Sequence, residues 1–399
     1  MLPRHFYTWE QRKFGNDIIS IHTGTNLLGR SDNKGLPLIK IGNIKNGEFD
    51  LSKLEYLEDD CIPNDEDFVK KGDFLFNTRN TLELVGKGAT WFGESDKYAF
   101  NSNIARFVLK NIITFFYNYL YNTAHVQKQI RARATGTTSV AAIYPKSLDS
   151  IKHFVPSLDE QSKLARYFQI LDNLITLHQR KLDKLKNIKK ALLEKMFPRN
   201  GENIPEVRFK GFSDDWEQRK FKDFTKQTGI RNKENLDLEP YSITNETGFV
   251  PQKDAHDEFG YMKNTDRSAY SIVSPNSFAY NPARINVGSI GYYKGDKNVI
   301  VSSLYEVFQT DKDIDDSFLW IWFKSSNFFN WINKLQEGSV RQYFYYDKLC
   351  ECKLPVPSLK EQEKIGTFFS KLDNLITLHQ RQYEQLVSLK KYLLSKMFI

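Results

Sequence analysis

Cysteine is scarce in this chain of 399 residues, where it occurs only as Cys61, Cys350 and Cys352. A small, odd number of cysteines argues against a disulfide-stabilised secreted fold and favours a reducing compartment. Cys350 and Cys352 have the spacing C-x-C, but the sequence has no second cysteine pair or neighbouring histidine to complete a metal site. We therefore expect these thiols to have a packing role.

Long apolar runs are also missing. No stretch reaches the roughly 18 apolar residues of a membrane-spanning helix, and the opening residues MLPRHFYTWEQRKF are too polar for a signal peptide. We therefore expect a cytoplasmic protein. Apolar residues make up 40% and charged residues 27% of the chain, which indicates a folded globular protein with two to three domains.

Familiar catalytic motifs are absent as well. The segment NPAR at 281–284 has one proline where an NPPY-type adenine methyltransferase motif has two. The segment GKGAT at 86–90 lacks both the first glycine and the Ser or Thr of a P-loop. The sequence shows no H-E-x-x-H or G-x-S-x-G motif and no nuclease-like cluster of carboxylates. We therefore expect a chain that is not itself an enzyme.

What the sequence does contain is a basic excess and many aromatic residues. The formal net charge is +8, and the chain has 30 Phe and 20 Tyr. Such a charge suits a polyanionic partner, nucleic acid above all, although many ordinary proteins carry the same excess.

A long internal repeat organises the chain. The decapeptide LDNLITLHQR occurs at 171–180 and again at 372–381, within longer repeats in which 24 of 41 aligned residues are identical. A second landmark, WEQRKF, occurs at 9–14 and 216–221, with an offset of 207 instead of 201. The repeated segments therefore flank two bodies of different length. The predicted segments are module one at 1–156, a helix at 157–197, a linker at 198–215, module two at 216–357 and a second helix at 358–399.

Both repeated segments have the pattern of a coiled-coil helix. Apolar residues recur at alternating steps of four and three, and S-x-x-E capping boxes start the helices at Ser157 and Ser358. Helices of roughly 60 Å need a partner, so we predict an antiparallel pair related by a pseudo-two-fold axis. His178 and His379 interrupt the pattern and are expected to fix register; a metal site is not expected. The predicted interface consists of Leu164, Phe168, Leu171, Ile175, His178, Leu182, Leu185, Leu192, Ile365, Phe369, Leu372, Ile376, His379, Tyr383, Leu386 and Leu393.

Each module combines short strand-like runs, separated by Gly, Asn and Asp turns, with one helical stretch, at 113–136 and 315–339. The predicted fold class is therefore α+β, with two α/β modules separated by the antiparallel pair of long coiled-coil helices.

The module loops carry side chains suited to DNA. Arg and Lys can pair with guanine, Asn and Gln with adenine, and any of them with phosphate. For each residue the alternative is a solvated surface side chain, and Arg79 and Arg284 could instead brace their turns. The candidates are Arg30, Lys34, Lys45, Arg79, Asn80, Lys87, Thr137 and Thr138 in module one, and Arg231, Asn232, Lys233, Asn245, Arg284, Asn286, Tyr292, Lys294, Arg341, Gln342 and Tyr343 in module two.

Two differing modules, each followed by a nearly copied long helix, resemble the specificity (S) subunit of type I restriction–modification systems. The resemblance covers the whole chain and rests on PSLDEQSKLARYFQILDNLITLHQRKLDKLKNIKKALLEKMF, its repeat, and DDWEQRKF at 214–221. The first copy begins at TWEQRKF without an equivalent of IPEVRFKGFSDD. We expect a slightly short N-terminus and a complete module one.

The resemblance implies that the modules are target recognition domains, each reading one half of an asymmetric, split site in double-stranded DNA. The helices would set the gap between the half-sites and dock two methyltransferase (M) subunits, after which motor–nuclease (R) subunits join. S-adenosylmethionine, ATP and magnesium are expected on those partners, which methylate adenine N6 and cleave DNA, and no cofactor is expected on this chain. The alternative is a coiled-coil scaffold whose modules bind proteins.

Overall fold

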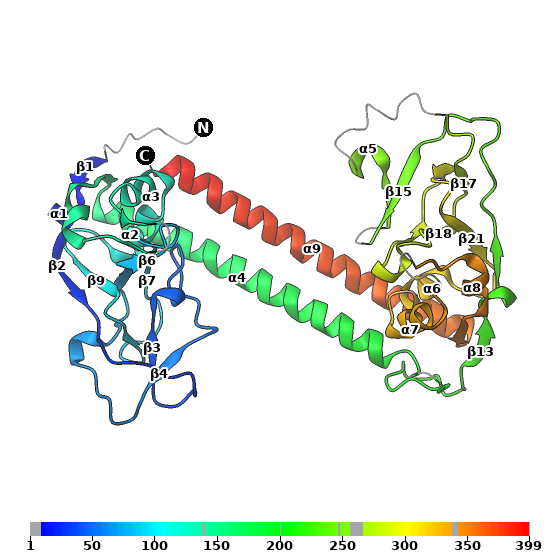
Figure 1. Cartoon of the computed structure of the whole chain (residues 1–399), viewed down its shortest axis with the longest axis horizontal. Coiled ribbons are helices and arrows are strands. Elements are labelled where there is room, and N and C mark those ends of the chain that lie inside the picture. The colour runs from blue at the N-terminus through cyan, green and yellow to red at the C-terminus, as the bar shows by residue number, and fades with distance from the viewer. Residues whose placement is uncertain are drawn as a thin grey trace. The chain divides into compact units, whose positions relative to one another are not determined.

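The computed structural model describes residues 9–137, 140–199, 201–245, 248–255, 266–336 and 342–398. The chain forms two compact units (Figure 1). Unit 1 comprises Met1–His178 and Arg381–Ile399, and unit 2 comprises Gln179–Gln380. The unit boundaries fall inside the two long helices, so each unit contains one module together with one end of each helix.

The long helices are α4 (Leu158–Lys195) and α9 (Leu359–Met397), with 38 and 39 residues. They confirm the two predicted helices. At the start of α4, Ser157 Oγ accepts a hydrogen bond from the backbone N–H of Glu160 at 3.4 Å. The Glu160 carboxylate was expected to bond back to Ser157, but it accepts a hydrogen bond from Trp9 Nε1 at 3.2 Å. The predicted capping box is therefore only half correct, because its glutamate ties the helix to module one.

Within each unit the two helices run antiparallel. In unit 1, Asp172 pairs with Lys390 at 2.5 Å, and the ring of Phe168, one turn earlier in α4, packs on that of Phe398, which directly follows α9. In unit 2, Lys189 pairs with Asp373 at 2.5 Å. Adding 201 to the numbers of Asp172 and Lys189 gives Asp373 and Lys390, so the two ion pairs are related by the sequence repeat. The predicted antiparallel arrangement and pseudo-two-fold repeat are thereby confirmed.

Module one contains three small sheets and a two-stranded closure. The closure pairs β1 (Glu10–Lys13) with β12 (Lys152–Val155). The sheet orders are β2 (Ile18–Thr23), β9 (Ile104–Leu109), β5 (Phe74–Asn77) and β7 (Gly88–Thr90); β4 (Glu55–Leu57), β3 (Leu36–Ile39) and β8 (Ala99–Phe100); and β10 (Thr135–Gly136), β11 (Ala141–Ala142) and β6 (Arg79–Asn80). Its helices are α1 (Phe14–Asp17), α2 (Thr114–Tyr121) and α3 (Ala124–Arg131).

Module two repeats the closure, the four-stranded sheet and, with one strand more, the second sheet; the sheet of β6, β11 and β10 has no counterpart among its described residues. The closure pairs β13 (Glu217–Lys220) with β22 (Lys353–Val356). The sheet orders are β14 (Thr225–Gln227), β21 (Glu306–Thr310), β18 (Ser277–Tyr280) and β19 (Ile290–Tyr293); and β16 (Gly248–Pro251), β15 (Pro240–Thr244), β20 (Val299–Val301) and β17 (Ser271–Val273). Its helices are α5 (Gln252–Ala255), α6 (Asp316–Trp322), α7 (Ser326–Leu335) and α8 (Tyr346–Glu351). The mixed content confirms the predicted α+β class.

The closures explain why WEQRKF occurs twice. Its residues form β1 and β13, and each strand pairs with the strand that leads into a long helix. Phe14, the last residue of the first WEQRKF, donates its backbone N–H to the carbonyl of Ile151 at 3.0 Å, and its copy Phe221 donates to the carbonyl of Cys352 at 3.1 Å. Each copy of WEQRKF is therefore hydrogen-bonded to the segment that leads into its long helix.

Aromatic side chains fill both module cores, which accounts for much of the high Phe and Tyr content. In unit 1, Phe74 stacks on Phe107 with ring centroids 5.7 Å apart, and in unit 2 Phe278 stacks on Phe308 at 5.2 Å. These rings come from neighbouring strands of the four-stranded sheets. The helices complete the cores, because Phe168 and Phe369 are fully buried among the same clusters. Burying such large rings is a major source of folding free energy.

All three cysteines are free thiols; Cys352 is buried, and Cys61 and Cys350 are half-buried. Among the described residues, no helix is both long enough and apolar enough to cross a membrane.

Candidate nucleic-acid interface

Module two gathers many of its predicted DNA-contacting residues around one pocket of about 870 Å³. The pocket is lined by residues of β14, β17 and β21, of the turn after β18 and of the segment before α8. Five candidates from three separate places in the sequence line it: Arg231, Arg284, Asn286, Gln342 and Tyr343.

The two arginines of this pocket differ in the contacts that their guanidinium groups already make within the chain. Arg231 Nη1 donates hydrogen bonds to the carbonyls of Ala269 and Ser303 and to Ser271 Oγ, at 3.0 to 3.1 Å. Arg284 is exposed, and no ion pair within the described part of the chain involves its guanidinium. Arg231 therefore braces the pocket wall, whereas Arg284 retains its donors for a ligand.

Sequence reasoning missed two lining residues with distinctive chemistry. The exposed Tyr345 stacks on Tyr343 with ring centroids 5.5 Å apart and planes 4° apart. The alternation of the two tyrosines in YFY could have indicated a shared face. Glu306 also lines the pocket and accepts a hydrogen bond from Gln227 Nε2 at 2.6 Å. An acidic residue gives no signal for DNA binding in the sequence, because a carboxylate repels phosphate.

Asn232 is an incorrect prediction. Its side chain is 1% exposed, its amide nitrogen donates to the carbonyl of Leu236, and its amide oxygen accepts the Leu236 N–H, both at 3.0 Å. Those bonds close a local turn and leave no access for a base or phosphate. Its neighbour Lys233 is exposed and lines, with Arg231, a second pocket of about 490 Å³.

Tyr292 and Lys294 lie toward α6, apart from the 870 Å³ pocket. The Tyr292 hydroxyl bonds to Asp316 Oδ2 at 2.8 Å and to Asn276 Oδ1 at 3.0 Å. Burial and the hydrogen bond to Asp316 raise the pKa of Tyr292. Lys294 Nζ lies 5.8 Å from the centre of the Tyr292 ring. Asn245, in contrast, is exposed and lies beside Gly288, in the turn that carries Arg284 and Asn286.

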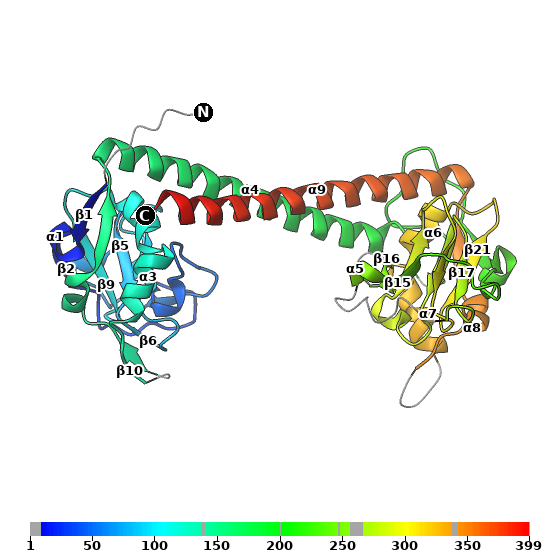
Figure 2. The ribbon, with the colours of Figure 1, turned by 90° about the horizontal axis from the view of Figure 1, so that it is seen from above.

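Three module-one candidates meet on the small sheet of β6, β11 and β10. Arg79 and Asn80 constitute β6 and pair with Ala142 and Ala141 of β11, while Thr137 directly follows β10. This sheet lies on the side of unit 1 away from its helix ends (Figure 2). Arg79 and Thr137 are exposed, and Asn80 Oδ1 accepts the Thr81 N–H at 2.8 Å.

The remaining module-one candidates are more dispersed. Arg30 is ion-paired with Glu58, and Lys45 lies 3.7 Å from Asp50, so acidic neighbours offset both charges. Lys34 is exposed and Lys87 is half-buried. Thr138 and Arg341 lie outside the residues that the structure describes.

The predicted helix interface is buried or half-buried at every position, from Leu164 to Leu393. His379 is buried and His178 half-buried. No group of three or more His, Cys, Asp or Glu side chains that could hold a metal occurs among the described residues.

An exposed flank of the helices has an apolar repeat that the buried seam does not explain. Leu174 is 38% and Leu177 60% exposed in α4, and their copies Leu375 and Leu378 are 47% and 50% exposed in α9. These residues belong to the identical decapeptide. Solvent-facing leucines preserved in both copies are typical of a binding surface.

Comparison with known proteins identifies the family. Residues 7–187 and 213–388 each match the family described as the type I restriction modification DNA specificity domain. The chain belongs to this family. Each match covers one module and most of the helix that follows it, which is the repeat unit seen in the sequence.

Relatives named as specificity subunits match almost the whole chain. A Methanocaldococcus jannaschii protein provisionally named as the specificity subunit of type I restriction enzyme MjaX is 25% identical over 418 aligned residues, covering 97% of this chain and 92% of that protein. The MjaVIII specificity subunit of the same organism is 24% identical over 387 residues, covering 90% and 87%. The crystal structure of an S subunit from M. genitalium has a TM-score of 0.59 at 15% identity, covering 100% and 98%. That structural similarity shows a shared fold.

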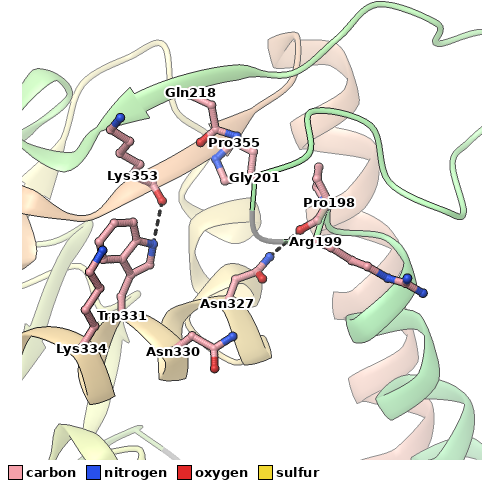
Figure 3. Close-up of a pocket in the computed structure, with 10 residues that line it drawn as sticks. All are labelled: Pro198, Arg199, Gly201, Gln218, Asn327, Asn330, Trp331, Lys334, Lys353 and Pro355. Carbon is pink, nitrogen blue, oxygen red and sulfur yellow. Dashed lines mark hydrogen bonds between the residues drawn. The ribbon is translucent and has the colours of Figure 1, made fainter.

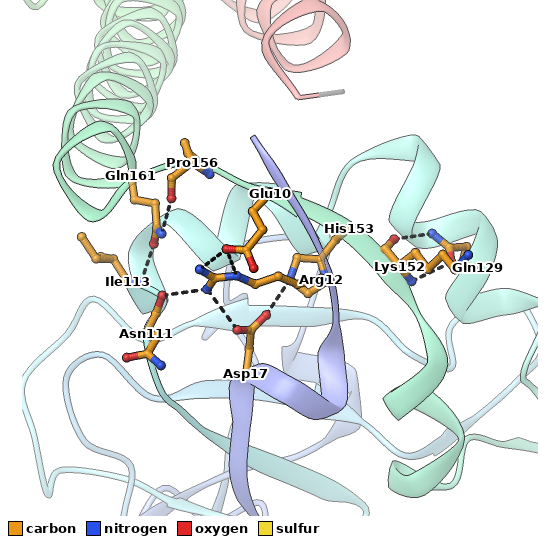
Figure 4. Close-up of polar contacts among 10 residues, drawn as sticks. All are labelled: Glu10, Arg12, Asp17, Asn111, Ile113, Gln129, Lys152, His153, Pro156 and Gln161. Carbon is orange, nitrogen blue, oxygen red and sulfur yellow. Dashed lines mark hydrogen bonds and ion pairs between the residues drawn. The ribbon is translucent and has the colours of Figure 1, made fainter. Parts of the chain in front are cut away.

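In this member of the specificity family, matched side chains fasten each module to its helix. Gln161 accepts the Ile113 N–H at 2.8 Å and donates to the Pro156 carbonyl at 2.9 Å (Figure 4). Its copy Gln362 accepts the Asp315 N–H at 2.9 Å and donates to the Pro357 carbonyl at 3.0 Å. The repeated glutamine therefore attaches each module to its helix, a role that helix periodicity alone did not reveal.

A second fastening lies in a pocket of about 350 Å³ at the end of α4 (Figure 3). Asn327 Nδ2 donates to the Pro198 carbonyl at 2.8 Å, and Trp331 Nε1 donates to the Lys353 carbonyl at 3.1 Å. In unit 1, Gln129 Nε2 donates to the Lys152 carbonyl at 2.8 Å (Figure 4). Trp331 and Gln129 thus make equivalent hydrogen bonds, each from a module helix to the closure strand of its own specificity domain.

Proposed function

We propose that this chain is the DNA sequence-specificity subunit of a type I restriction–modification complex, in which each module reads one half of an asymmetric, bipartite site. One observation carries the proposal: two modules of one topology present different polar side chains at equivalent positions. Asn77 ends β5 and Asn281 directly follows the matching strand β18, but three residues later stand Asn80 in one module and Arg284 in the other. Different donor sets read different base edges.

The helices support a partner present in two copies. Packing of the seam requires apolar residues on one face, but it does not require Leu174 and Leu177 to recur as exposed Leu375 and Leu378. Two copies of one subunit, docked on α4 and α9, would require the same surface twice. We assign that role to two methyltransferase subunits, with motor–nuclease subunits joining the assembly.

The chemistry belongs to those partners. In this proposal S-adenosylmethionine, ATP and magnesium bind the methyltransferase and motor–nuclease subunits, which methylate adenine N6 and cleave DNA. This chain contributes no catalytic residue; its part is to position the enzymes on the target.

Methylation mapping tests the proposal directly. Genomic DNA from cells carrying the complete system should be methylated at one split, asymmetric sequence, and binding of the complex to that target should weaken steeply as salt rises. Methylation that follows no sequence, or modules that bind proteins but no duplex, would favour the scaffold alternative.

A matched deletion tests the spacer role. Removing seven residues from both helices, at positions related by the repeat, preserves the seam and shortens each helix by roughly 10 Å. The gap between half-sites should shrink by about three base pairs, with both half-site sequences retained. Altered half-sites with an unchanged gap would contradict the assigned spacer.

A further inference from the structure

The pocket of module two contains a carboxylate where a polyanion is expected to bind. Glu306, the first residue of β21, lines the pocket together with Arg284. The carboxylate is half-buried and fixed by the 2.6 Å hydrogen bond from Gln227 Nε2. Burial raises the pKa of Glu306, while the hydrogen bonds from Gln227 and the Tyr346 backbone act in the opposite direction.

The fold itself does not require an acid at this position. Strand pairing places Tyr280 opposite Glu306 in module two and Phe76 opposite Ala105 in module one. Tyr280 and Phe76 each precede the shared asparagine, so Glu306 and Ala105 are equivalent. The matching sheet of module one is therefore built with a buried methyl group at the same place.

A carboxylate in such a pocket selects its ligand by hydrogen-bond type. Glutamate in its ionised form only accepts hydrogen bonds, and it repels phosphate oxygens at short range. Among DNA groups, the exocyclic amino groups of cytosine N4 and adenine N6 are donors that a carboxylate can accept in the major groove. The neighbouring Arg284 can offset the negative charge while it contacts phosphate or guanine.

We propose that Glu306 is a specificity-determining residue of module two, where its carboxylate accepts a hydrogen bond from the exocyclic amino group of one base in the half-site. This inference rests on the proposed function of the chain. It assigns to module two a base preference that module one, with Ala105, does not share.

The test compares Glu306→Gln with the unchanged chain, each in the complete system, by mapping methylated sites. Glutamine can both donate and accept, so one position of the module-two half-site should come to tolerate keto bases, with discrimination there reduced about ten-fold. Binding of the complex to non-target duplex should tighten at low salt, because a negative charge has been removed. The half-site of module one should not change.

Two further variants control the comparison. Glu351→Gln makes the same chemical change at an exposed position of the same module, outside the pocket, and should leave the target unaltered. Glu306→Asp keeps the acceptor and should keep the amino-base preference, and it serves if the glutamine variant fails to fold.

The proposal is overturned if Glu306→Gln folds and methylates the parent target with undiminished discrimination. It is equally overturned if discrimination falls at every position of both half-sites, since that indicates a structural role. Failure of the proposed function would look different, because the unchanged chain would then direct no sequence-specific methylation.

Discussion

The two units share a framework but fill one corner of it differently. In unit 1 the buried Asp17 bonds to His153 Nε2 at 2.8 Å and to Arg12 Nη1 at 3.3 Å (Figure 4). In unit 2 the equivalents of Asp17 and His153 are Phe224 and Leu354, as matching backbone bonds show: Lys110 donates to the Asp17 carbonyl and Asp311 to the Phe224 carbonyl. Arg219 lies over the Phe224 ring at 5.4 Å. A polar cluster and an apolar contact therefore support the same closure.

A second difference lies at the helix starts. The Glu361 carboxylate is fully buried and accepts hydrogen bonds from Arg208 Nε and Nη2 at 2.7 and 2.8 Å. Its copy Glu160 accepts a hydrogen bond from Trp9 at Oε1, and Glu160 Oε2 is buried without a hydrogen-bond partner among the described residues. The units therefore differ most in their polar contacts, whereas their apolar frameworks match. The following tests exploit these differences.

The largest effect is expected on the surface that the units share. Leu174→Glu with Leu177→Glu places two carboxylates on the exposed face of α4 and should abolish docking of one methyltransferase copy. The assembly should change from two copies to one per chain by native mass spectrometry. The corresponding change at Leu375 and Leu378 should remove the other copy.

The control for that experiment is Lys181→Gln, which copies the residue found at the matching position 382. It should preserve both docking sites. Retention of two copies by both glutamate variants would show that the repeated leucines are not the docking surface.

The Arg208–Glu361 pair should matter more than its counterpart in unit 1. Arg208→Ala leaves a buried carboxylate without its partner and should lower the free energy of unfolding by about 3 to 5 kcal/mol. Trp9→Phe removes one neutral donor from Glu160 and should cost about 1 kcal/mol. Calorimetry on both variants measures the difference, and Glu361→Gln added to Arg208→Ala should recover part of the loss.

Equal losses from Arg208→Ala and Trp9→Phe would contradict this asymmetry. Amide hydrogen exchange localises each effect, since β13 and β22 should open first in the Arg208 variant. In the Trp9 variant the affected strands should be β1 and β12.

Substitutions at Asp17 and His153 test whether the polar cluster of unit 1 can be replaced by the apolar residues that occupy the equivalent positions in unit 2. Asp17→Ala alone should cost about 2 kcal/mol, because His153 loses its carboxylate partner and Arg12 loses one of its acceptors, keeping Glu10 and the Asn111 carbonyl. Asp17→Phe with His153→Leu should cost less, since well-packed apolar groups often replace buried polar pairs without loss. The double change also removes His153 Nδ1, a buried atom without a partner among the described residues. If chemical denaturation showed a larger loss of unfolding free energy for the double variant than for Asp17→Ala, the polar and apolar clusters would not be interchangeable.

Sequence patterns were most informative where periodicity and repetition carried the signal. The steps of four and three predicted α4 and α9 and their need for a partner, because one apolar face must be buried along the whole helix. The repeat, read as a pseudo-two-fold relation, predicted that the two helices pair antiparallel. Repetition of WEQRKF marked the start of each module, but only the structure showed that it pairs with the strand that leads into the long helix. Pairing partners of this kind are distant in sequence, and no local pattern specifies them.

The candidate site was less predictable. Arg284, Gln342 and Tyr343 were correctly placed in loops, yet their convergence on one pocket depends on the tertiary fold. Asn232 was misassigned because a polar loop residue that braces its own turn has the same local sequence signal as a ligand. Glu306 was missed because an acid is unexpected in a DNA-binding surface.

The smallest expected effect concerns the ion pairs between the helices. Asp373 is 37% and Lys189 20% exposed, so Asp373→Ala should cost less than about 1 kcal/mol and lose its effect in high salt. Asp172→Ala should cost about 1 kcal/mol more, because Asp172 Oδ2 also accepts a hydrogen bond from the Tyr119 hydroxyl at 2.9 Å. The residue equivalent to Tyr119 in unit 2 is Ile321, which has no hydroxyl.

Tyr119→Phe separates the two contributions of Asp172. Burial and the nearby Asp172 carboxylate raise the pKa of Tyr119, so the hydroxyl remains a donor at neutral and moderately alkaline pH. In the Tyr119→Phe background, Asp172→Ala should therefore cost no more than Asp373→Ala, as measured by denaturant titration at two salt concentrations. If the excess cost of Asp172→Ala persisted without the hydroxyl, the asymmetry between the units would have to arise from packing around α2 instead of from this hydrogen bond.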